Sequence, residues 1–417
     1  MPRRLALACV GLMLAAATAR AQAPIASGAI PSRTALSRIG LDMHWAAVVP
    51  LQGAEKVTSL SIDSGLVFAQ TNLANFFAFD GESGRMLWSA HLGRVTTQSF
   101  PAAVNSFGVF VTNSNRLFAL DRRTGGQMWS QELSDTPSCA TAANETRVVV
   151  GLESGKLAGY DAKTGATDWF FSTNARISSR PQLTERVVAV GSQDGKVLVS
   201  RSEKYVQLYR FATSNKIVAP LANYGIRTLL IPSTDHVLYA VDLFTGQELW
   251  NHASGSAIVQ EPLVADKDIF LVNEAGELSA LDAETGQPRW AISTLGGRIL
   301  SVSGTKLYLE THDDDLFVVD RATGKTIFDP RMTYQRSGVN LRDFTLGMTN
   351  RFDDRLYLGM KTGLLICLRE SAQVRPRLLR DPNAKPFGYI PPEGYPNPDA
   401  PQPIPSAEPA AEAPANP

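Results

Sequence analysis

The chain has 417 residues, well above the usual ~150 residues of one domain, and its 40 basic residues balance its 40 acidic ones. This neutrality argues against a nucleic-acid partner, because such binding needs an excess of Lys and Arg to neutralise phosphates. Hydrophobic residues make up 44% of the chain, enough for a large core. Repeat folds often exceed the ordinary domain length, so internal repetition decides the domain count.

The first residues have the pattern of a secretory signal peptide. Arg3 and Arg4 precede an apolar stretch over residues 5–19, and residues 19–21 read Ala-Arg-Ala before Gln22. The apolar stretch is shorter than the ~20 residues that span a membrane, and the small residues at its end are typical of a cleavage site. We therefore predict a signal peptide over 1–21 and an exported protein, periplasmic or at the cell surface, without a transmembrane segment. Cys9 lies too early in the apolar stretch to be a lipoprotein attachment site.

A phrase of thirteen residues then recurs along the chain. An apolar strand is followed by Asp, two variable residues, Thr or Ser, Gly, three variable residues and Trp. The copies occupy residues 76–88, 117–129, 157–169, 238–250 and 278–290, with a divergent copy at 316–328. With Trp45, the structural positions of this motif are Trp45, Asp80, Trp88, Asp121, Trp129, Asp161, Trp169, Asp242, Trp250, Asp282, Trp290 and Asp320.

Each motif position has a physical role. Asp accepts hydrogen bonds from its own turn, and Gly adopts the left-handed conformation that a bulged hairpin requires. Trp starts the return strand, where its large face can pack on the neighbouring unit. One such unit cannot bury its own apolar faces, so the copies must stack.

The spacing of the copies counts the blades. The gap between Asp161 and Asp242 is twice the normal step, and aligning the strands places a hidden unit there with Arg201 at the Asp position and Tyr209 at the Trp position. A last inner strand follows Gly363 without its Trp strand, whereas Trp45 is a Trp strand without an Asp turn. The two complete each other, which removes open sheet edges. The sequence predicts an all-β, eight-bladed β-propeller whose N-terminal strand closes the last blade.

The predicted domains follow from these repeats. An N-terminal extension covers 22–40, the propeller 41–370, and a disordered Pro/Ala-rich tail 371–417. The tail is interpreted as a spacer, with a docking segment for an aromatic-lined groove as the alternative. Cys139 and Cys367 are the cysteines left after cleavage, and we predict both to be small buried side chains without a disulfide.

The motif Ala240-Val-Asp242-Leu-Phe-Thr-Gly246-Gln-Glu-Leu-Trp250 resembles the pyrroloquinoline-quinone (PQQ) repeat family, over about residues 41–370. The resemblance implies the propeller fold. It is closer to the non-catalytic propeller scaffold of the outer-membrane barrel assembly machinery than to the quinoprotein dehydrogenases. Those enzymes imply PQQ over the central axis, a calcium ion held by Glu, Asn and Asp, an Asp base and, in one branch, adjacent cysteines. No such cysteine pair occurs, and no calcium ligand or catalytic residue can be carried over to this sequence.

We therefore predict a non-catalytic, monomeric scaffold with protein partners in the cell envelope and no expected cofactor. The alternative is a small PQQ-dependent dehydrogenase with PQQ and calcium in the central funnel. No triad, phosphate loop or metal-ligand spacing stands out. The residues 312–315, His-Asp-Asp-Asp, offer oxygen ligands suited to calcium, but they fall where the second and third strands of the seventh blade turn. We interpret them as an acidic hairpin.

The loops before each innermost strand are the candidate ligand site at the funnel mouth. They carry several cations, which could hold an anionic group, although solvated loop residues are the simpler interpretation. The candidate ligand-binding residues are Gln98, Arg180, Lys216, Gln260, Glu261, Arg298, Arg342 and Asp343. Residues 200–205 of the fourth blade replace the turn motif with charged and aromatic residues, either by drift or as a partner-binding edge.

Overall fold

A computed structural model gives the structure of the chain. It describes residues 30–95, 100–204, 206–294, 296–330, 335 and 338–390. The chain divides into two compact units, 1–30 and 31–417, and Ile30 is the described residue of the first. The predicted signal peptide over 1–21 lies outside the described residues, as do residues 22–29 and 391–417.

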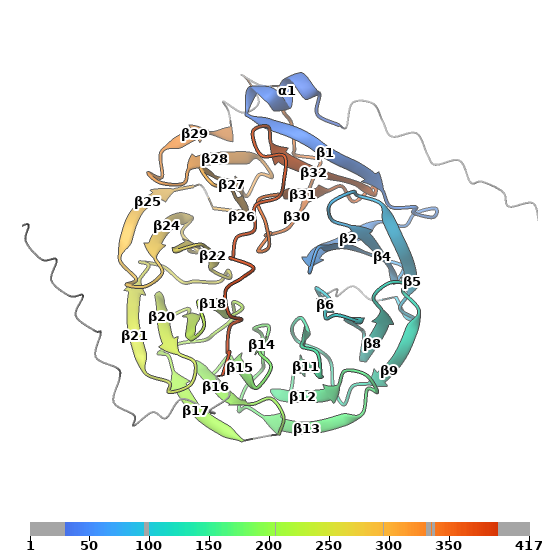
Figure 1. Ribbon diagram of the computed structural model, residues 1–417, viewed down its shortest axis with the longest axis vertical. Helices are drawn as coiled ribbons and strands as arrows, with labels where there is room; N and C mark the ends of the chain where they lie inside the picture. Colours follow the sequence, from blue (N-terminus) through green and yellow to red (C-terminus); the bar gives the residue numbers. More distant parts are fainter. Residues whose placement is uncertain are drawn as a thin grey trace, which may run out of the picture. The chain divides into compact units, whose positions relative to one another are not determined.

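The described strands of the second unit form eight four-stranded sheets arranged as blades of a ring (Figure 1). Blade 1 contains β2 (Val57–Asp63), β3 (Leu66–Thr71), β4 (Asn75–Asp80) and β5 (Met86–His91). Blade 2 contains β6 (Ala103–Val104), β7 (Gly108–Asn113), β8 (Arg116–Asp121) and β9 (Gln127–Glu132). Blade 3 contains β10 (Ala142–Ala143), β11 (Arg147–Gly151), β12 (Lys156–Asp161) and β13 (Thr167–Ser172). Blade 4 contains β14 (Gln182–Leu183), β15 (Val187–Gly191), β16 (Lys196–Arg201) and β17 (Gln207–Ala212).

The remaining four blades follow the same order from the inside of the ring outward. Blade 5 contains β18 (Ala222–Tyr224), β19 (Thr228–Pro232), β20 (Val237–Asp242) and β21 (Glu248–Ala253). Blade 6 contains β22 (Leu263–Ala265), β23 (Asp268–Val272), β24 (Glu277–Asp282) and β25 (Pro288–Ser293). Blade 7 contains β26 (Arg298–Val302), β27 (Lys306–Glu310), β28 (Leu316–Asp320) and β29 (Thr326–Phe328). Blade 8 contains β30 (Leu346–Gly347), β31 (Leu356–Gly359), β32 (Leu364–Glu370) and β1 (Leu41–Val48).

Blade 8 closes the ring with strands from both ends of the propeller. β1 pairs antiparallel with β32, and Trp45 lies opposite Cys367. This pairing satisfies the outer edge of β32, which would otherwise stay open. The eight-bladed fold and its closure by the N-terminal strand are thus confirmed.

The repeat motif joins most neighbouring blades through one contact, which we call the latch. In the latch between blades 1 and 2, Trp88 of blade 1 packs under Gly125 in the Thr-Gly turn of blade 2. Gly125 has a φ of 70°, and a Cβ added to it would lie 2.5 Å from a Trp88 ring carbon. The Trp88 indole nitrogen donates to the Arg122 carbonyl at 2.9 Å. The motif therefore requires Gly for two reasons, backbone conformation and space for the ring.

The Asp of each motif orders its own turn. Asp121 Oδ1 accepts hydrogen bonds from the Thr124 amide at 2.8 Å and the Thr124 hydroxyl at 2.9 Å. These bonds favour the ionised carboxylate and lower the pKa of Asp121. The same bonds form at the other motif carboxylates, which are Asp80, Asp161, Asp242, Asp282 and Asp320.

The hidden fourth blade is present, with Tyr209 in the place of Trp. A Cβ on Gly246 of blade 5 would lie 2.5 Å from the Tyr209 ring, and the Tyr209 hydroxyl donates to the Asp242 carbonyl at 3.1 Å. Residues 200–204 include buried Ser200 and Ser202 and exposed Glu203 and Lys204, while residue 205 lies outside the described residues.

The apolar core lies between the blades, not in one central mass. Phe68 and Phe76 of blade 1 pack with Val109 and Val111 of blade 2, and each side chain is almost fully buried. Cys139 and Cys367 are buried free thiols, as predicted. Burial raises the pKa of Cys139 to about 12.

The described part of the N-terminal extension forms one short helix, α1 (Arg33–Arg38). Ser32 caps it by accepting a hydrogen bond from the Ala35 amide at 3.1 Å. Ala35 and Leu36 are buried, which fixes the chain at the entry to β1.

Residues 371–390, which we call the strap, differ from the predicted disordered tail. The strap follows β32 and crosses the centre of the ring on the face that carries the loops between the first and second strands of the blades, here called the AB loops (Figure 1). It contacts AB loops of four blades. The Leu379 amide donates to the Phe352 carbonyl at 2.9 Å in blade 8, and the Gly388 amide donates to the Ile226 carbonyl at 2.8 Å in blade 5. The composition of the strap suggested disorder. Its anchors come from distant blades, so no local sequence pattern could reveal them.

Candidate functional site: the central cavity

A cavity of about 590 Å³ opens at the centre of the ring. Its walls come from the innermost strands of blades 3 and 4, from the inner strands and AB loops of blades 5 and 6, from the AB loop of blade 8 and from Asp63 of blade 1. Its cover comes from the strap. This volume lies within the range of ~300–1,000 Å³ typical of small-molecule sites. The charged residues that line it are Asp63, Arg180, Glu261, Asp266, Arg351, Arg380, Asp381 and Lys385.

Two ion pairs line the cavity near the axis of the propeller. Arg351 donates to Glu261 in a short hydrogen-bonded pair. The other pair is looser, because the nearest nitrogen and oxygen of Arg180 and Asp63 are 3.7 Å apart. Asp63 also accepts a hydrogen bond from the Val104 amide at 3.3 Å. Blades 1, 4, 6 and 8 thus each place one charged residue near the axis.

Burial and neighbouring charge act differently on the two arginines. The pKa of Arg180 is lowered, first because burial removes water from the guanidinium and second because Arg351 carries the same charge. The pKa of Arg351 is raised, mainly by the adjacent Glu261 carboxylate. Both groups remain cationic at neutral pH, but Arg180 is the less well compensated of the two.

Of the sequence-predicted ligand residues, the structure brings Arg180 and Glu261 to this cavity. Gln98 lies outside the described residues. Lys216 and Asp343 are exposed in loops away from the cavity lining. Their assignment as ligand-binding residues stays a prediction.

The other three predicted residues have local partners. Gln260 donates to the Gly297 carbonyl at 2.6 Å, and Arg298 pairs with Glu310 at 2.5 Å. Arg342 makes a two-pronged pair with Asp315 at 2.8 and 2.7 Å. Asp315 belongs to the turn between β27 and β28, so residues 312–315 form the predicted acidic hairpin.

Sequence reasoning missed Asp63 and Arg351. It considered the loops that lead into each innermost strand, whereas these two residues lie at the end of β2 and after β30, at the AB side. The available signal was an ionisable residue at the end of an innermost strand or shortly after it. No local pattern showed that Asp63 would approach Arg180, more than a hundred positions away, or that Arg351 would approach Glu261, 90 positions away.

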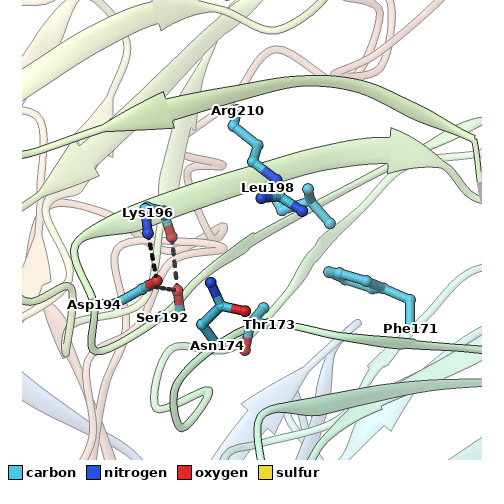
Figure 2. A pocket seen from close by; sticks show the side chains of 8 residues that line it. All are labelled: Phe171, Thr173, Asn174, Ser192, Asp194, Lys196, Leu198 and Arg210. Atoms are coloured by element: carbon cyan, nitrogen blue, oxygen red, sulfur yellow. Dashed lines mark hydrogen bonds and ion pairs between the residues drawn. The ribbon is translucent and has the colours of Figure 1, made fainter.

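The second pocket lies between blades 3 and 4 and is much smaller, about 20 Å³ (Figure 2). Lys196 pairs with Asp194 at 3.0 Å, and the Lys196 carbonyl accepts a hydrogen bond from the Ser192 hydroxyl at 3.0 Å. Its space is about that of a single water, and three of its polar residues, Ser192, Asp194 and Lys196, already bind one another. The pocket is therefore part of the blade interface.

The charged residues of the central cavity do not fit a calcium ion with PQQ. Calcium prefers six to eight oxygen ligands, but the Glu261 carboxylate is held by Arg351 and Asp63 faces Arg180. Across the described ranges, no group of three or more His, Cys, Asp or Glu side chains is arranged to hold a metal ion. Over those same ranges, no helix has the length and apolar character needed to cross a membrane.

The closed ring, the interblade latches and the axial cavity define an eight-bladed propeller of PQQ-type repeats. The family described as outer membrane protein assembly factor BamB matches residues 75–204 and 185–386. These segments span most of the sequence, and the chain belongs to this family.

The chain is also similar to individual proteins and to solved structures of this fold. The outer membrane protein assembly factor BamB of Shewanella oneidensis is 24% identical over 403 residues, covering 86% of this chain and 97% of that protein. The dehydrogenase subunit of the quinone alcohol dehydrogenase of Gluconobacter oxydans is 24% identical over 355 residues, but only 44% of that subunit is covered. The crystal structure of BamB from Moraxella catarrhalis has a TM-score of 0.65 at 18% identity, covering 80% of this chain and 99% of that one.

Proposed function

We propose that this protein is an exported, non-catalytic scaffold that takes part in the assembly of outer-membrane proteins and works through protein partners in the cell envelope. The coverage of its relatives carries the proposal. The match covers 97% of one assembly factor but 44% of one dehydrogenase subunit, so more than half of that enzyme lies outside the match. Fold alone would not decide between the two.

The geometry supports a scaffold in a second way. The latches and the β1–β32 closure tie eight blades into one ring, and rigid elements present a partner surface with little loss of conformational entropy on binding. At the centre, the two carboxylates near the axis are each matched to an arginine. Glu261 and Asp63 are thus engaged with cations, as expected of carboxylates with a structural role.

The first test is deletion of the gene in its native host, followed by quantification of folded outer-membrane β-barrel proteins. We expect their amounts to fall and to recover with the full-length gene. The Trp88→Ala variant, chosen to weaken the ring, should restore them less well than the conservative Tyr209→Phe variant. Unchanged amounts of barrel proteins in the deletion strain would contradict the assembly role.

The second test addresses the enzyme alternative directly. Purified protein is titrated with PQQ and calcium and then assayed for dye reduction with simple alcohols and sugars. We expect no turnover. Saturable PQQ binding with turnover would replace the scaffold by a quinoprotein dehydrogenase.

A further inference from the structure

The strap contains two consecutive parts, 371–379 and 380–386, that are held very differently. Its first part, 371–379, lies over Arg355, whose side chain is 1% exposed and donates to the Gln373 and Val374 carbonyls at 3.0 and 2.7 Å. Leu379 ends this part, 2% exposed, within the apolar core of blades 6 and 7. A guanidinium buried in this way depends on those carbonyls, because an unpaired buried charge is very costly. The first part is therefore a fixed element of the fold.

The second part, 380–386, is exposed at every residue and bonds chiefly to itself. The Arg380 side chain donates to the Lys385 carbonyl at 2.7 Å, and the Ala384 amide donates to the Asp381 carbonyl at 3.1 Å. The hydrogen bond that joins this part to the propeller, from Arg380 to the Gly225 carbonyl, is long at 3.4 Å. Few buried contacts and a self-contained set of bonds are the features of a segment that opens locally.

Both ends of the second part of the strap are fastened to the propeller. Leu379 holds one end, and Gly388 holds the other with a φ of 74° and a packing contact against Thr184. Phe387 packs beside it on the core of blades 4 and 5. Arg380, Asp381, Ala384 and Lys385 form the cavity cover between these two anchors.

Arg180 lies beneath the second part of the strap, and its guanidinium still has hydrogen-bond donors available. Its side chain is 23% exposed toward the cavity, and its contact with Asp63 at 3.7 Å is too long for a good hydrogen bond. Among the described residues, none accepts a hydrogen bond from the Arg180 guanidinium. Arg351, in contrast, is committed to Glu261.

We propose that the central cavity is a binding site for a small anionic molecule, that Arg180 receives its anionic group, and that residues 380–386 form a lid over the site. The guanidinium presents a planar fork of donors that suits a carboxylate or a phosphate. Partial burial strengthens this attraction relative to water. The site is separate from the scaffold function and does not depend on it.

Charge selection at the site is tested with a single introduced thiol. Ala143 lines the cavity and is partly exposed, whereas Cys139 and Cys367 are buried thiols with raised pKa values that react slowly. In full-length Ala143→Cys protein that also carries Cys9→Ala, an anionic methanethiosulfonate reagent should label faster than a cationic one by about threefold or more, after correction for their rates with a free thiol.

Variants and a competing anion assign this preference to Arg180. Arg180→Gln should remove it, Arg180→Lys should keep most of it, and Arg298→Gln, whose Arg pairs with Glu310 outside the cavity lining, should leave it unchanged. Inorganic phosphate should slow the anionic reagent more than sodium chloride at the same ionic strength, and this difference should vanish in Arg180→Gln. Equal rates for the two reagents in the parent, or no specific effect of phosphate, would overturn the anion site.

The lid is tested with two glycine variants in the same Ala143→Cys background. A Cβ on Gly388 would lie 2.4 Å from Thr184, whereas one on Gly255, whose φ of 75° is nearly the same, meets nothing within 4 Å. Gly388→Ala should unfasten the lid and raise the labelling rate about tenfold, and Gly255→Ala should not, because it adds backbone strain without a clash. Thermal unfolding confirms that both variants remain folded. If both label at the parent rate, residues 380–386 do not act as a lid.

Discussion

The latch between blades 1 and 2 and the two latches that flank blade 4 solve the same packing problem with different residues. Trp88 and Gly125 form the first with both motif residues present. On one side of blade 4, Trp169 faces a turn without the motif Gly, and on the other side Tyr209 takes the place of Trp.

One contact survives in all three latches. Trp88, Trp169 and Tyr209 each donate to a backbone carbonyl of the next blade, at 2.9, 2.9 and 3.1 Å. Because a buried ring with a polar tip needs a hydrogen-bond partner, the carbonyl contact is the part of the latch that substitution cannot remove cheaply. The aromatic side chain of a latch can therefore differ in shape, but its polar tip must have a hydrogen-bond acceptor.

The largest expected effect comes from removing the ring of an intact latch. Trp88→Ala deletes a side chain that is 6% exposed and in contact with Phe68 and Phe76. We expect the free energy of unfolding to fall by about 4 kcal/mol, measured by denaturant unfolding. If Trp88→Ala lowers the free energy of unfolding less than Tyr209→Phe does, the aromatic side chains of the latches contribute little to the stability of the propeller.

A smaller loss of stability is expected from filling the space above the Trp88 indole. Gly125→Ala combines a left-handed φ with a Cβ that would clash with Trp88, so we expect a loss of about 3 kcal/mol. Gly255→Ala shares the strain without the clash and should cost about 1 kcal/mol. The difference between the two midpoints of unfolding measures the steric part of the latch. Equal losses would mean that backbone conformation alone explains the motif Gly.

The polar tip can be removed alone at the substituted latch. Tyr209→Phe keeps the ring over Gly246 and deletes the hydroxyl that bonds to the Asp242 carbonyl, so we expect a loss of about 1 kcal/mol. Denaturant unfolding of the two proteins at pH 7 provides the measurement. A neutral result would contradict the view that the carbonyl contact is the invariant element.

The smallest effect concerns pH and separates two motif turns. A hydrogen bond from Arg289 at 2.7 Å is the main reason that the pKa of Asp282 falls to about 2. Since the folded pKa lies below the unfolded value of ~3.9, this carboxylate stabilises the fold above about pH 4 and loses that contribution as pH falls toward 2.

The measurement is an NMR titration of the turn carboxylates. Arg289→Gln should raise the pKa of Asp282 toward its ordinary value. Asp320, whose pKa is lowered by bonds from Thr323 instead, should not move. If Asp282 keeps its low pKa in the variant, the turn bonds from Thr285 and Glu284 and not Arg289 hold it down.

Sequence periodicity determined the fold because each repeat carries its own structural instructions. Asp, Thr-Gly and Trp act within a short segment or between adjacent blades, so their spacing was enough to count the blades. Even the divergent fourth blade could be found, since Tyr209 keeps the register of the missing Trp. Trp45 without a turn and β32 without an outer strand were enough to predict the closure.

The central site was open to sequence reasoning only in part. Arg180 and Glu261 were identifiable because they directly precede innermost strands, a position that every blade repeats. Their partners Asp63 and Arg351 lie at the opposite ends of innermost strands in other blades, where no repeated residue marks them.

The tertiary structure alone decided which charges meet and what covers them. Asp63 and Arg180 become neighbours because closing eight blades brings the ends of distant innermost strands to one axis. The strap is ordered because Arg355 of blade 8 donates to its backbone carbonyls and because Leu379 and Gly388 find partners in other blades, although its composition is that of a disordered tail. Local patterns encode blades, whereas a cavity at the axis belongs to none of them and exists only once the ring has closed.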